Sequence, residues 1–85
     1  MLSSKHTRTL AAIFANPVKA DIRWTDIESL FRALGGEIKE GAGSRVRVEL
    51  RGVKIVLHRP HPRPETDRGA VVTVRKFLSD ARVNP

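Results

Sequence analysis

The sequence contains no cysteine, no long apolar run and few aromatic residues. Without cysteine the chain can form neither a disulfide nor a thiolate metal site. Its 85 residues must therefore fold by packing one modest core, and we expect a single domain over residues 1–85. Lys5, His6 and Arg8 interrupt the N-terminal segment, so neither a signal peptide nor a membrane span is expected there. These absences predict a cytoplasmic protein that does not associate with membranes.

Acidic residues are scarce as well. The chain has 9 Asp and Glu against 16 Lys and Arg, which gives a formal net charge of +7. Such a balance favours polyanionic partners, nucleic acid first and an acidic protein second. Because aromatic residues are few, stacking on single-stranded bases is unfavourable, whereas recognition of an RNA duplex by its shape remains possible. The alternative is a small basic domain whose charge has no role in binding.

The strongest pattern lies between residues 45 and 58, where two apolar runs alternate with polar residues. The apolar positions are Val46, Val48, Leu50, Val53, Ile55 and Leu57. This period of two is typical of half-buried strands. The dipeptide Arg51-Gly52 between the runs predicts a two-residue turn, because glycine accepts the positive φ that such turns require. A turn that tight pairs Arg45 with His58 and places the apolar side chains on one face of the hairpin.

Two helices and a short strand are predicted before the hairpin. Ser3 or Ser4 can cap a first helix that ends at about residue 15, and a connector over residues 19–23 follows. Thr25 and Glu28 match a capping box for a second helix, which ends with Gly35 in the left-handed conformation. Residues 37–40 form a short strand.

A last helix is predicted after the hairpin, over about residues 68–81, with Asp67 as its N-cap. Its basic residues off the buried stripe, Arg68, Arg75 and Lys76, are expected to extend the positive surface. The element order is then α-α-β-β-β-α. We predict an α+β fold with a three-stranded antiparallel sheet and helices packed on one face, similar to double-stranded-RNA-binding domains.

The candidate binding residues gather on the hairpin, on the loop before it and on the proline-rich segment after it. The loop over residues 41–44 has two glycines and a serine, so its backbone can approach a phosphate closely, although such a stretch is also common in ordinary turns. The open face of the hairpin is expected to be basic, with only Glu49 opposing. The candidate RNA-binding residues are Gly43, Ser44, Arg45, Arg47, Arg51, Lys54 and Arg63.

These segments resemble the HicA-type toxins of bacterial toxin–antitoxin pairs. The resemblance rests on WTDIESLFRALGGEI, GAGSRVRVEL, HRPHP and RGAVVTVRKFL, with Gly43-Ser44 as the family's glycine–serine motif and His61 eight residues before Gly69. It implies a core over residues 24–82, a helical extension over residues 1–18, and a small mRNA interferase that cleaves without a metal or cofactor. It also implies two partners, mRNA and a HicB-like antitoxin.

The sequence departs from the family at one position that matters for catalysis. Many members carry a histidine directly after the glycine–serine pair, and here that position is Arg45. Arginine stays protonated and cannot act as a base, although it can hold a phosphate. The expected catalytic residues are therefore His58, opposite Arg45, and His61, as base and acid. A metal site at these two histidines is not expected, because no third ligand lies nearby.

Three hypotheses follow from these observations. The first is a HicA-like endoribonuclease that an antitoxin inhibits. The second is a non-catalytic RNA-binding or protein-binding module on the same fold, because Arg45 replaces the expected histidine. The third is a structural role in which the basic face docks on an acidic protein. RNA cleavage after removal of a bound protein would distinguish the first hypothesis from the third.

Overall fold

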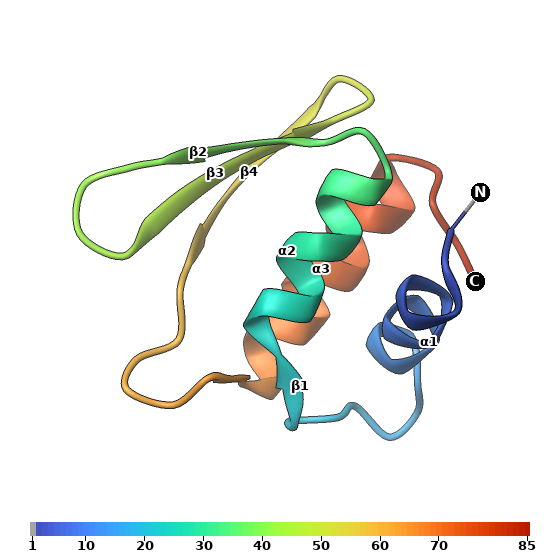
Figure 1. Cartoon of the computed structure of the whole chain (residues 1–85). Coiled ribbons are helices and arrows are strands. Elements are labelled where there is room, and N and C mark those ends of the chain that lie inside the picture. Colours follow the sequence, from blue (N-terminus) through green and yellow to red (C-terminus); the bar gives the residue numbers. More distant parts are fainter. Residues whose placement is uncertain (1) are drawn as a thin grey trace.

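The structure, a computed structural model, describes residues 2–85. It has the α+β architecture expected from the sequence, with one three-stranded antiparallel sheet in the order β2-β3-β4. Figure 1 shows the arrangement of the elements. In chain order they are α1 (Ser4–Ile13), β1 (Ile22–Arg23), α2 (Trp24–Ala33), β2 (Glu37–Glu40), β3 (Arg45–Leu50), β4 (Val53–His58), β5 (Glu65–Thr66) and α3 (Arg68–Asp80).

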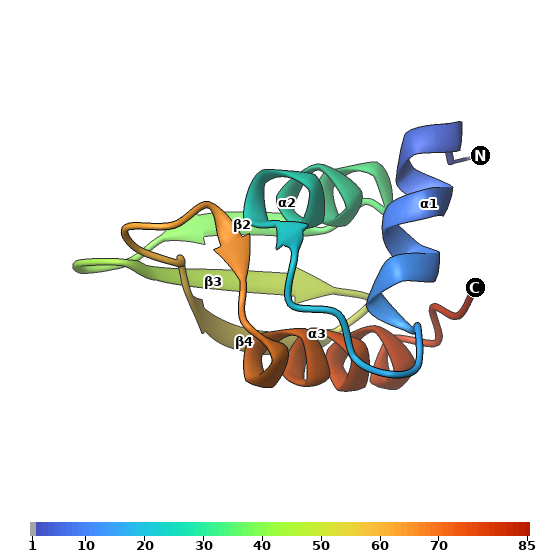
Figure 2. The same cartoon turned by 90° about the horizontal axis from the view of Figure 1, so that it is seen from below.

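The elements form three layers. Helices α2 and α3 lie side by side under one face of the sheet, with α2 near β2 and α3 near β4 (Figures 1 and 2). Helix α1 does not contact the sheet face. It crosses α2 and α3 on the side away from the sheet, so the opposite face of the three strands is left without a helix.

The hairpin has the register predicted from its alternating pattern. Arg45 pairs with His58, Val46 with Leu57 and Leu50 with Val53. Both turn residues have positive φ, 50° at Arg51 and 81° at Gly52, as a two-residue type I′ turn requires. The inward side chains of β3 are buried and its outward side chains are exposed, which fixes which face of the sheet meets the helices.

The core lies between the sheet and the helix pair. Ile27, Leu30 and Phe31 on α2 are fully buried, as are Val71 and Val74 on α3. These positions repeat every three or four residues, which places them on one side of each helix. Each of the two helices therefore turns one apolar stripe toward the core.

The predicted N-caps of α1 and α3 are confirmed. The Ser3 side chain accepts a hydrogen bond from the His6 backbone N–H at 3.2 Å. The Asp67 side chain accepts one from Ala70 at 2.8 Å. Each cap satisfies one of the N–H groups that have no partner within the helix.

The capping box predicted for α2 is wrong. This helix begins at Trp24, its N-cap is Arg23, and no side chain caps it. Glu28 does not reach back to the helix start, because its carboxylate accepts a hydrogen bond from Arg59 instead. Gly35 does follow the helix with a φ of 87°, which is the left-handed conformation expected from the sequence.

The segment before α2 pairs with the segment before α3, and the sequence analysis did not predict this pairing. Ile22 and Arg23 form a two-stranded antiparallel ladder with Thr66 and Glu65. The Trp24 N–H extends it by donating to the Pro64 carbonyl at 2.9 Å. The connector and the end of the proline-rich segment are thereby fixed to each other, next to the starts of both core helices.

Two basic residues of α3 donate hydrogen bonds to backbone carbonyls of the N-terminal region. The Arg75 guanidinium donates to the carbonyls of Ile13 at 2.9 Å and Ala15 at 2.8 Å, at the end of α1. Arg68 donates to the Val18 carbonyl at 3.2 Å. The expectation that Arg75 adds to a basic binding surface is corrected, because carbonyls at the end of α1 hold its half-buried guanidinium. Arg68 is exposed and only its Nε–H is engaged, so it remains part of the positive surface.

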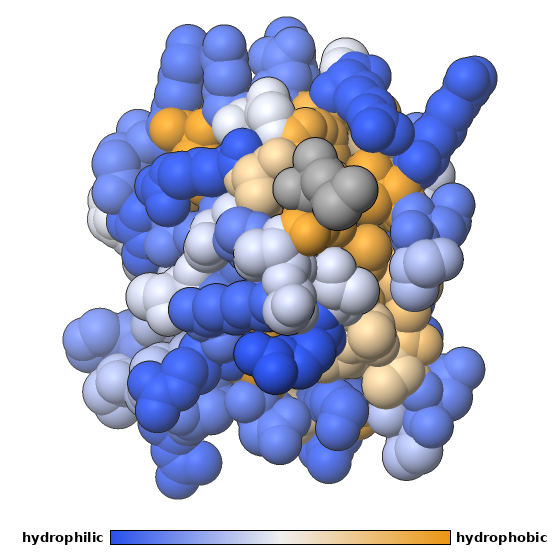
Figure 3. Space-filling view, turned by 45° about the vertical axis from the view of Figure 1, so that its right-hand side comes forward, coloured by the Kyte–Doolittle hydropathy of each residue, from blue (hydrophilic) through white to orange (hydrophobic). Residues whose placement is uncertain are grey.

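His6 joins α1 to α2. Its ring lies between the hydroxyl groups of Ser3 and Ser29, at 2.9 Å from each, so it is a packing residue. Figure 3 views the α1 side of the molecule and shows a strip of apolar surface bordered by hydrophilic side chains. Among residues 2–85, no helix has the length and apolar character needed to span a bilayer.

Candidate nucleic-acid interface

The loop that precedes β3 is closed by its own backbone. Gly41 N–H donates to the Arg45 carbonyl at 2.9 Å, and Arg45 N–H donates to the Ala42 carbonyl at 3.3 Å. Gly43 has a φ of 65°, which favours glycine for conformational reasons alone. A Cβ at Gly43 would meet no atom within 4 Å. The loop therefore presents a tight, exposed turn whose outer side is open.

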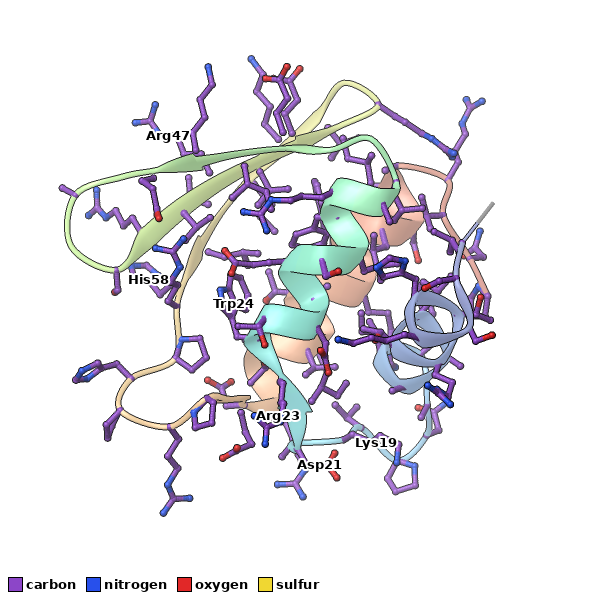
Figure 4. The ribbon with its side chains drawn as sticks, viewed as in Figure 1. Lys19, Asp21, Arg23, Trp24, Arg47 and His58 are labelled. Atoms are coloured by element: carbon purple, nitrogen blue, oxygen red, sulfur yellow. The ribbon has the colours of Figure 1, made fainter. Side chains whose placement is uncertain are left out.

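Arg45 and His58 lie beside this loop as cross-strand partners. The Arg59 N–H donates to the Ser44 carbonyl at 2.9 Å, so the ladder continues one pair past the ends of β3 and β4. Both side chains are exposed. Figure 4 places His58 at the end of β4, where the chain leaves the sheet. The structure thus brings together Ser44, Arg45 and His58, three of the residues singled out from the sequence.

His61 and Arg63 lie on the segment between β4 and β5, and both are exposed. Neither side chain forms a hydrogen bond or ion pair with any of residues 2–85. His61 is three residues beyond His58. The segment that carries it is anchored at both ends, by the Arg59–Ser44 hydrogen bond and by the Trp24–Pro64 hydrogen bond. The segment therefore lies at the same end of the molecule as the loop (Figure 1).

The open face, which we define as the sheet face away from α2 and α3, is less basic than expected. Glu49 was the only acidic residue expected among the cations of this face. Strand β2 adds Glu37, which pairs with Glu49, and Lys39, which pairs with Arg47. Figure 4 shows Arg47 pointing away from the helices. The charged side chains around the centre of this face line a hollow of about 420 Å³. The outward residues are Glu37, Lys39, Arg45, Arg47, Glu49, Lys54, Val56 and His58.

Arg51 lies at the other end of the hairpin from His58. Its guanidinium donates to the carbonyls of Ala81 at 3.2 Å and Arg82 at 3.1 Å, which closes the C-terminal end of α3. Strands rise about 3.3 Å per residue, so six residues separate Arg51 from Arg45 by roughly 20 Å. The structure therefore places Arg51 apart from the Arg45–His58 pair, with its Nη1 group bound to the end of the C-terminal helix.

The residue that sequence reasoning missed is Arg59. One of its terminal nitrogens lies 3.2 Å from a Glu28 carboxylate oxygen on α2 and 2.7 Å from a Glu40 oxygen at the end of β2. Glu28 is only 9 % exposed, so this cation neutralises a carboxylate that has little access to water. Arg59 thereby ties α2, β2 and the Ser44 loop to the start of the His61 segment. Arg59 lies within the HRPHP stretch that the sequence singles out. Its partners Glu40 and Glu28 are 19 and 31 positions away in the chain, so the sequence does not show the pairing.

The pKa of the Glu40 carboxyl is held below its ordinary value, chiefly by its hydrogen bond to Arg59. A depressed pKa means that ionised Glu40 stabilises the fold above the pKa of the unfolded chain, and that this contribution disappears as the pH falls through the folded-state pKa. We expect Arg59→Gln to lower the urea midpoint at neutral pH. The difference from the wild type should shrink between about pH 5 and pH 3.

Arg63→Gln is the matched control, because it removes the same charge from the same segment without breaking a hydrogen bond or ion pair recorded within residues 2–85. Urea unfolding followed by circular dichroism at several pH values measures the effect. An Arg59→Gln midpoint equal to that of Arg63→Gln at neutral pH would contradict the role assigned to Arg59.

A second hollow of about 480 Å³ lies between α1 and the start of α2. Its charged lining is mixed. The lining residues include the cations Arg8, Lys19 and Arg23 and the carboxylates Asp21 and Asp26. Figure 4 labels Lys19, Asp21 and Arg23. Since Lys5 already pairs with Asp26 at 3.2 Å, the charges of this hollow partly compensate one another. It is a weaker candidate for an anion site than the loop end of the sheet.

The loop end of the sheet has the groups that phosphate binding and proton transfer require. Arg45 offers a permanent cation, and the His58 imidazole offers ring nitrogens that can accept or donate a proton. Backbone N–H groups of the loop lie beside them. No three His, Asp or Glu side chains within residues 2–85 gather in a group that could hold a metal ion.

The core of the chain matches the model of a known protein family. A family model described as "HicA toxin of bacterial toxin-antitoxin" matches residues 24–83, which begin at α2 and include the sheet, the loop and α3. Helix α1 lies outside the matched range. No curated protein and no solved structure matches the chain. Because the match spans most of the sequence, the chain belongs to the HicA family of toxins from bacterial toxin–antitoxin systems.

Proposed function

We propose that this protein is a metal-independent endoribonuclease whose target is mRNA and whose inhibitor is a HicB-like antitoxin. One observation carries the proposal. In a member of the HicA family, the hairpin register pairs Arg45 with His58, and the family resemblance implies a histidine where Arg45 stands. A proton acceptor and a phosphate-binding cation are thereby adjacent at an exposed loop.

The proposed reaction uses the RNA's own 2′-hydroxyl. Neutral His58 accepts the 2′-hydroxyl proton, and the 2′-oxygen attacks the adjacent phosphorus. The bond to the 5′-oxygen breaks, and protonated His61 donates the proton that this leaving oxygen needs. The products are a 2′,3′-cyclic phosphate and a 5′-hydroxyl. Arg45 stabilises the extra negative charge on the phosphoryl oxygens during the attack.

The remaining candidate residues divide by distance from this centre. Gly43 and Ser44 bring backbone close to a phosphate at the reacting position, and Arg47, Lys54 and Arg63 bind neighbouring phosphates. Arg51 contributes to this surface least, because it lies at the far end of the hairpin and its Nη1 group already donates to the carbonyls of Ala81 and Arg82. Binding of this kind weakens as the salt concentration rises.

Expression in bacterial cells that lack the antitoxin tests the proposal. We expect wild-type protein to arrest growth, and we expect His58→Ala and His61→Ala to abolish the arrest at equal protein level, because a proton-transfer group is lost. His6→Ala is the control, since His6 only joins α1 to α2 and its variant should remain toxic. Arrest by all four proteins would show that toxicity does not depend on the proposed centre.

A non-catalytic RNA-binding module is the second candidate, and Arg45 favours it. Arginine at the family's histidine position strengthens phosphate binding but cannot take a proton. In this case the protein would bind RNA with a steep salt dependence, would not cleave it, and would keep binding when His58 is replaced. The two candidates therefore differ in cleavage and agree in binding.

A further inference from the structure

Strand β4 is an unpartnered edge of the sheet. The strand order is β2-β3-β4, so β4 pairs with β3 on one side only. Helix α3 contacts its inner face, and no strand lies beyond its outer edge in Figures 1 and 2. An exposed strand edge is a template for the addition of another strand.

The register identifies which backbone groups point outward. In a two-residue hairpin the pair next to the turn, Leu50 and Val53, exchanges both hydrogen bonds, and bonded pairs then alternate along the ladder. Continued past the strand ends, this alternation makes Ser44 and Arg59 a bonded pair. The Arg59 N–H does donate to the Ser44 carbonyl, which supports the assignment. The N–H and C=O groups of Lys54, Val56 and His58 therefore point away from β3, and no loop or cap hydrogen bond within residues 2–85 uses them.

The side chains of the same three residues lie on the open face and are exposed. Val56 is 52 % exposed, which is unusual for a valine at the middle of a strand. Lys54 and His58 flank it two positions away on either side. The edge thus presents an apolar centre between two basic side chains, with Arg47 adjacent as the cross-strand partner of Val56.

We propose that β4 is a docking edge for an extended acidic segment of a partner protein, which adds to the sheet as a fourth strand. The docked strand would hydrogen-bond to the outward groups of Lys54, Val56 and His58. On the open face, its side chains opposite Lys54 and His58 would be acidic and the one opposite Val56 would be apolar. The recognised pattern is therefore acidic-x-apolar-x-acidic.

Electrostatic repulsion disfavours a second copy of this chain as the added strand. Two copies joined through β4 in antiparallel fashion around Val56 would place Lys54 of each copy opposite His58 of the other, among four arginines at positions 45 and 47. The β2 edge is a poor match, because the residues whose backbone groups point away from β3, Ile38 and Glu40, have their side chains on the helix side of the sheet, where Arg59 already binds Glu40. The proposal does not depend on RNA cleavage, since docking requires no catalysis.

The test uses the full chain and a synthetic peptide with the sequence Thr-Glu-Thr-Val-Thr-Glu-Thr. Val56→Pro removes the outward N–H without breaking a bond to β3, and proline is tolerated at strand edges in this orientation. Val56→Thr keeps that N–H and is the matched control. We expect Val56→Pro to weaken peptide binding by at least about tenfold and Val56→Thr by less than about threefold. Equal binding by the proline variant and the wild type would overturn the proposal.

Two further measurements keep the proposal testable if Val56→Pro disturbs the fold by circular dichroism. Lys54→Glu should weaken the same peptide and strengthen a version with lysine in place of both glutamates. Amide hydrogen exchange should show new protection at Lys54, Val56 and His58 when the acidic peptide is bound. No binding of this peptide by the wild type, or protection of these amides by single-stranded RNA and not by the peptide, would contradict docking of a protein strand at β4.

Discussion

If the proposed reaction is correct, replacing either His58 or His61 with alanine should lower the rate of RNA cleavage by about 10² to 10⁴, the range typical for loss of a general acid or base. His58 lies opposite Arg45 at the loop end of the sheet, and its loss leaves no neutral nitrogen there to accept the 2′-hydroxyl proton. Because the two groups act in one reaction, the double variant should be little slower than the slower single variant. Cleavage of a long single-stranded RNA under single-turnover conditions measures these rates.

Two further variants separate chemistry from folding. His6→Ala should leave the cleavage rate unchanged while it lowers the urea midpoint, because its ring hydrogen-bonds only to serines of the N-terminal region and α2. Arg45→His, combined with His58→Ala, should restore part of the lost rate by placing an imidazole across the ladder from the missing one. Unchanged cleavage in both His58→Ala and His61→Ala would contradict the proposed centre.

Phe31→Ala lowers the free energy of unfolding by about 3–5 kcal/mol. Phe31 is fully buried, and its ring packs edge-to-face on Phe77 with centroids 5.6 Å apart and an interplanar angle of 87°. This contact joins α2 to α3 beneath the sheet. Since domains of this size have a total stability of only about 5–15 kcal/mol, the variant should be partly unfolded at 37 °C. Urea unfolding at 25 °C gives the value.

The matched controls for Phe31→Ala use the same two helices. Val72→Ala on α3 removes a side chain that is 48 % exposed, and should change the free energy of unfolding by no more than about 0.5 kcal/mol. Phe31→Leu retains most of the buried volume and should lose less than Phe31→Ala. A loss below about 1 kcal/mol for Phe31→Ala would show that the Phe31–Phe77 contact does not organise the core as described.

The hairpin was predicted in detail because its determinants are local. Six alternating apolar positions and one Arg-Gly turn are enough to set the register, since a shift by one residue would expose the entire apolar face. The juxtaposition of Arg45 and His58 follows from that register alone. The caps at Ser3, Asp67 and Gly35 were predictable for the same reason, since each depends on groups within a few residues.

The errors concern contacts between distant segments. Glu28 has the correct spacing for a capping box, but Arg59, 31 residues later, offers it a cation, and an ionic hydrogen bond is about twice as strong as a neutral one. Nothing in the sequence near Arg51 and Arg75 indicates a partner for either side chain. In the structure both guanidinium groups donate hydrogen bonds to carbonyls at helix ends. The β1–β5 pair has only two residues on each side, too few to produce an alternating pattern. The β1–β5 pair anchors the segment that carries His61. The sequence therefore identified His61 as a candidate residue but did not predict its position in the structure.

The proposed function depends most directly on whether the wild-type protein cleaves RNA when no metal is accessible. The decisive measurement incubates purified protein, free of antitoxin, with a long single-stranded RNA and excess chelator, and determines the product termini by mass spectrometry. We expect cleavage at an undiminished rate, with 2′,3′-cyclic phosphate and 5′-hydroxyl ends, because attack by the 2′-oxygen needs only proton transfer and charge stabilisation. Binding without cleavage, or cleavage that the chelator abolishes, would contradict the proposed function.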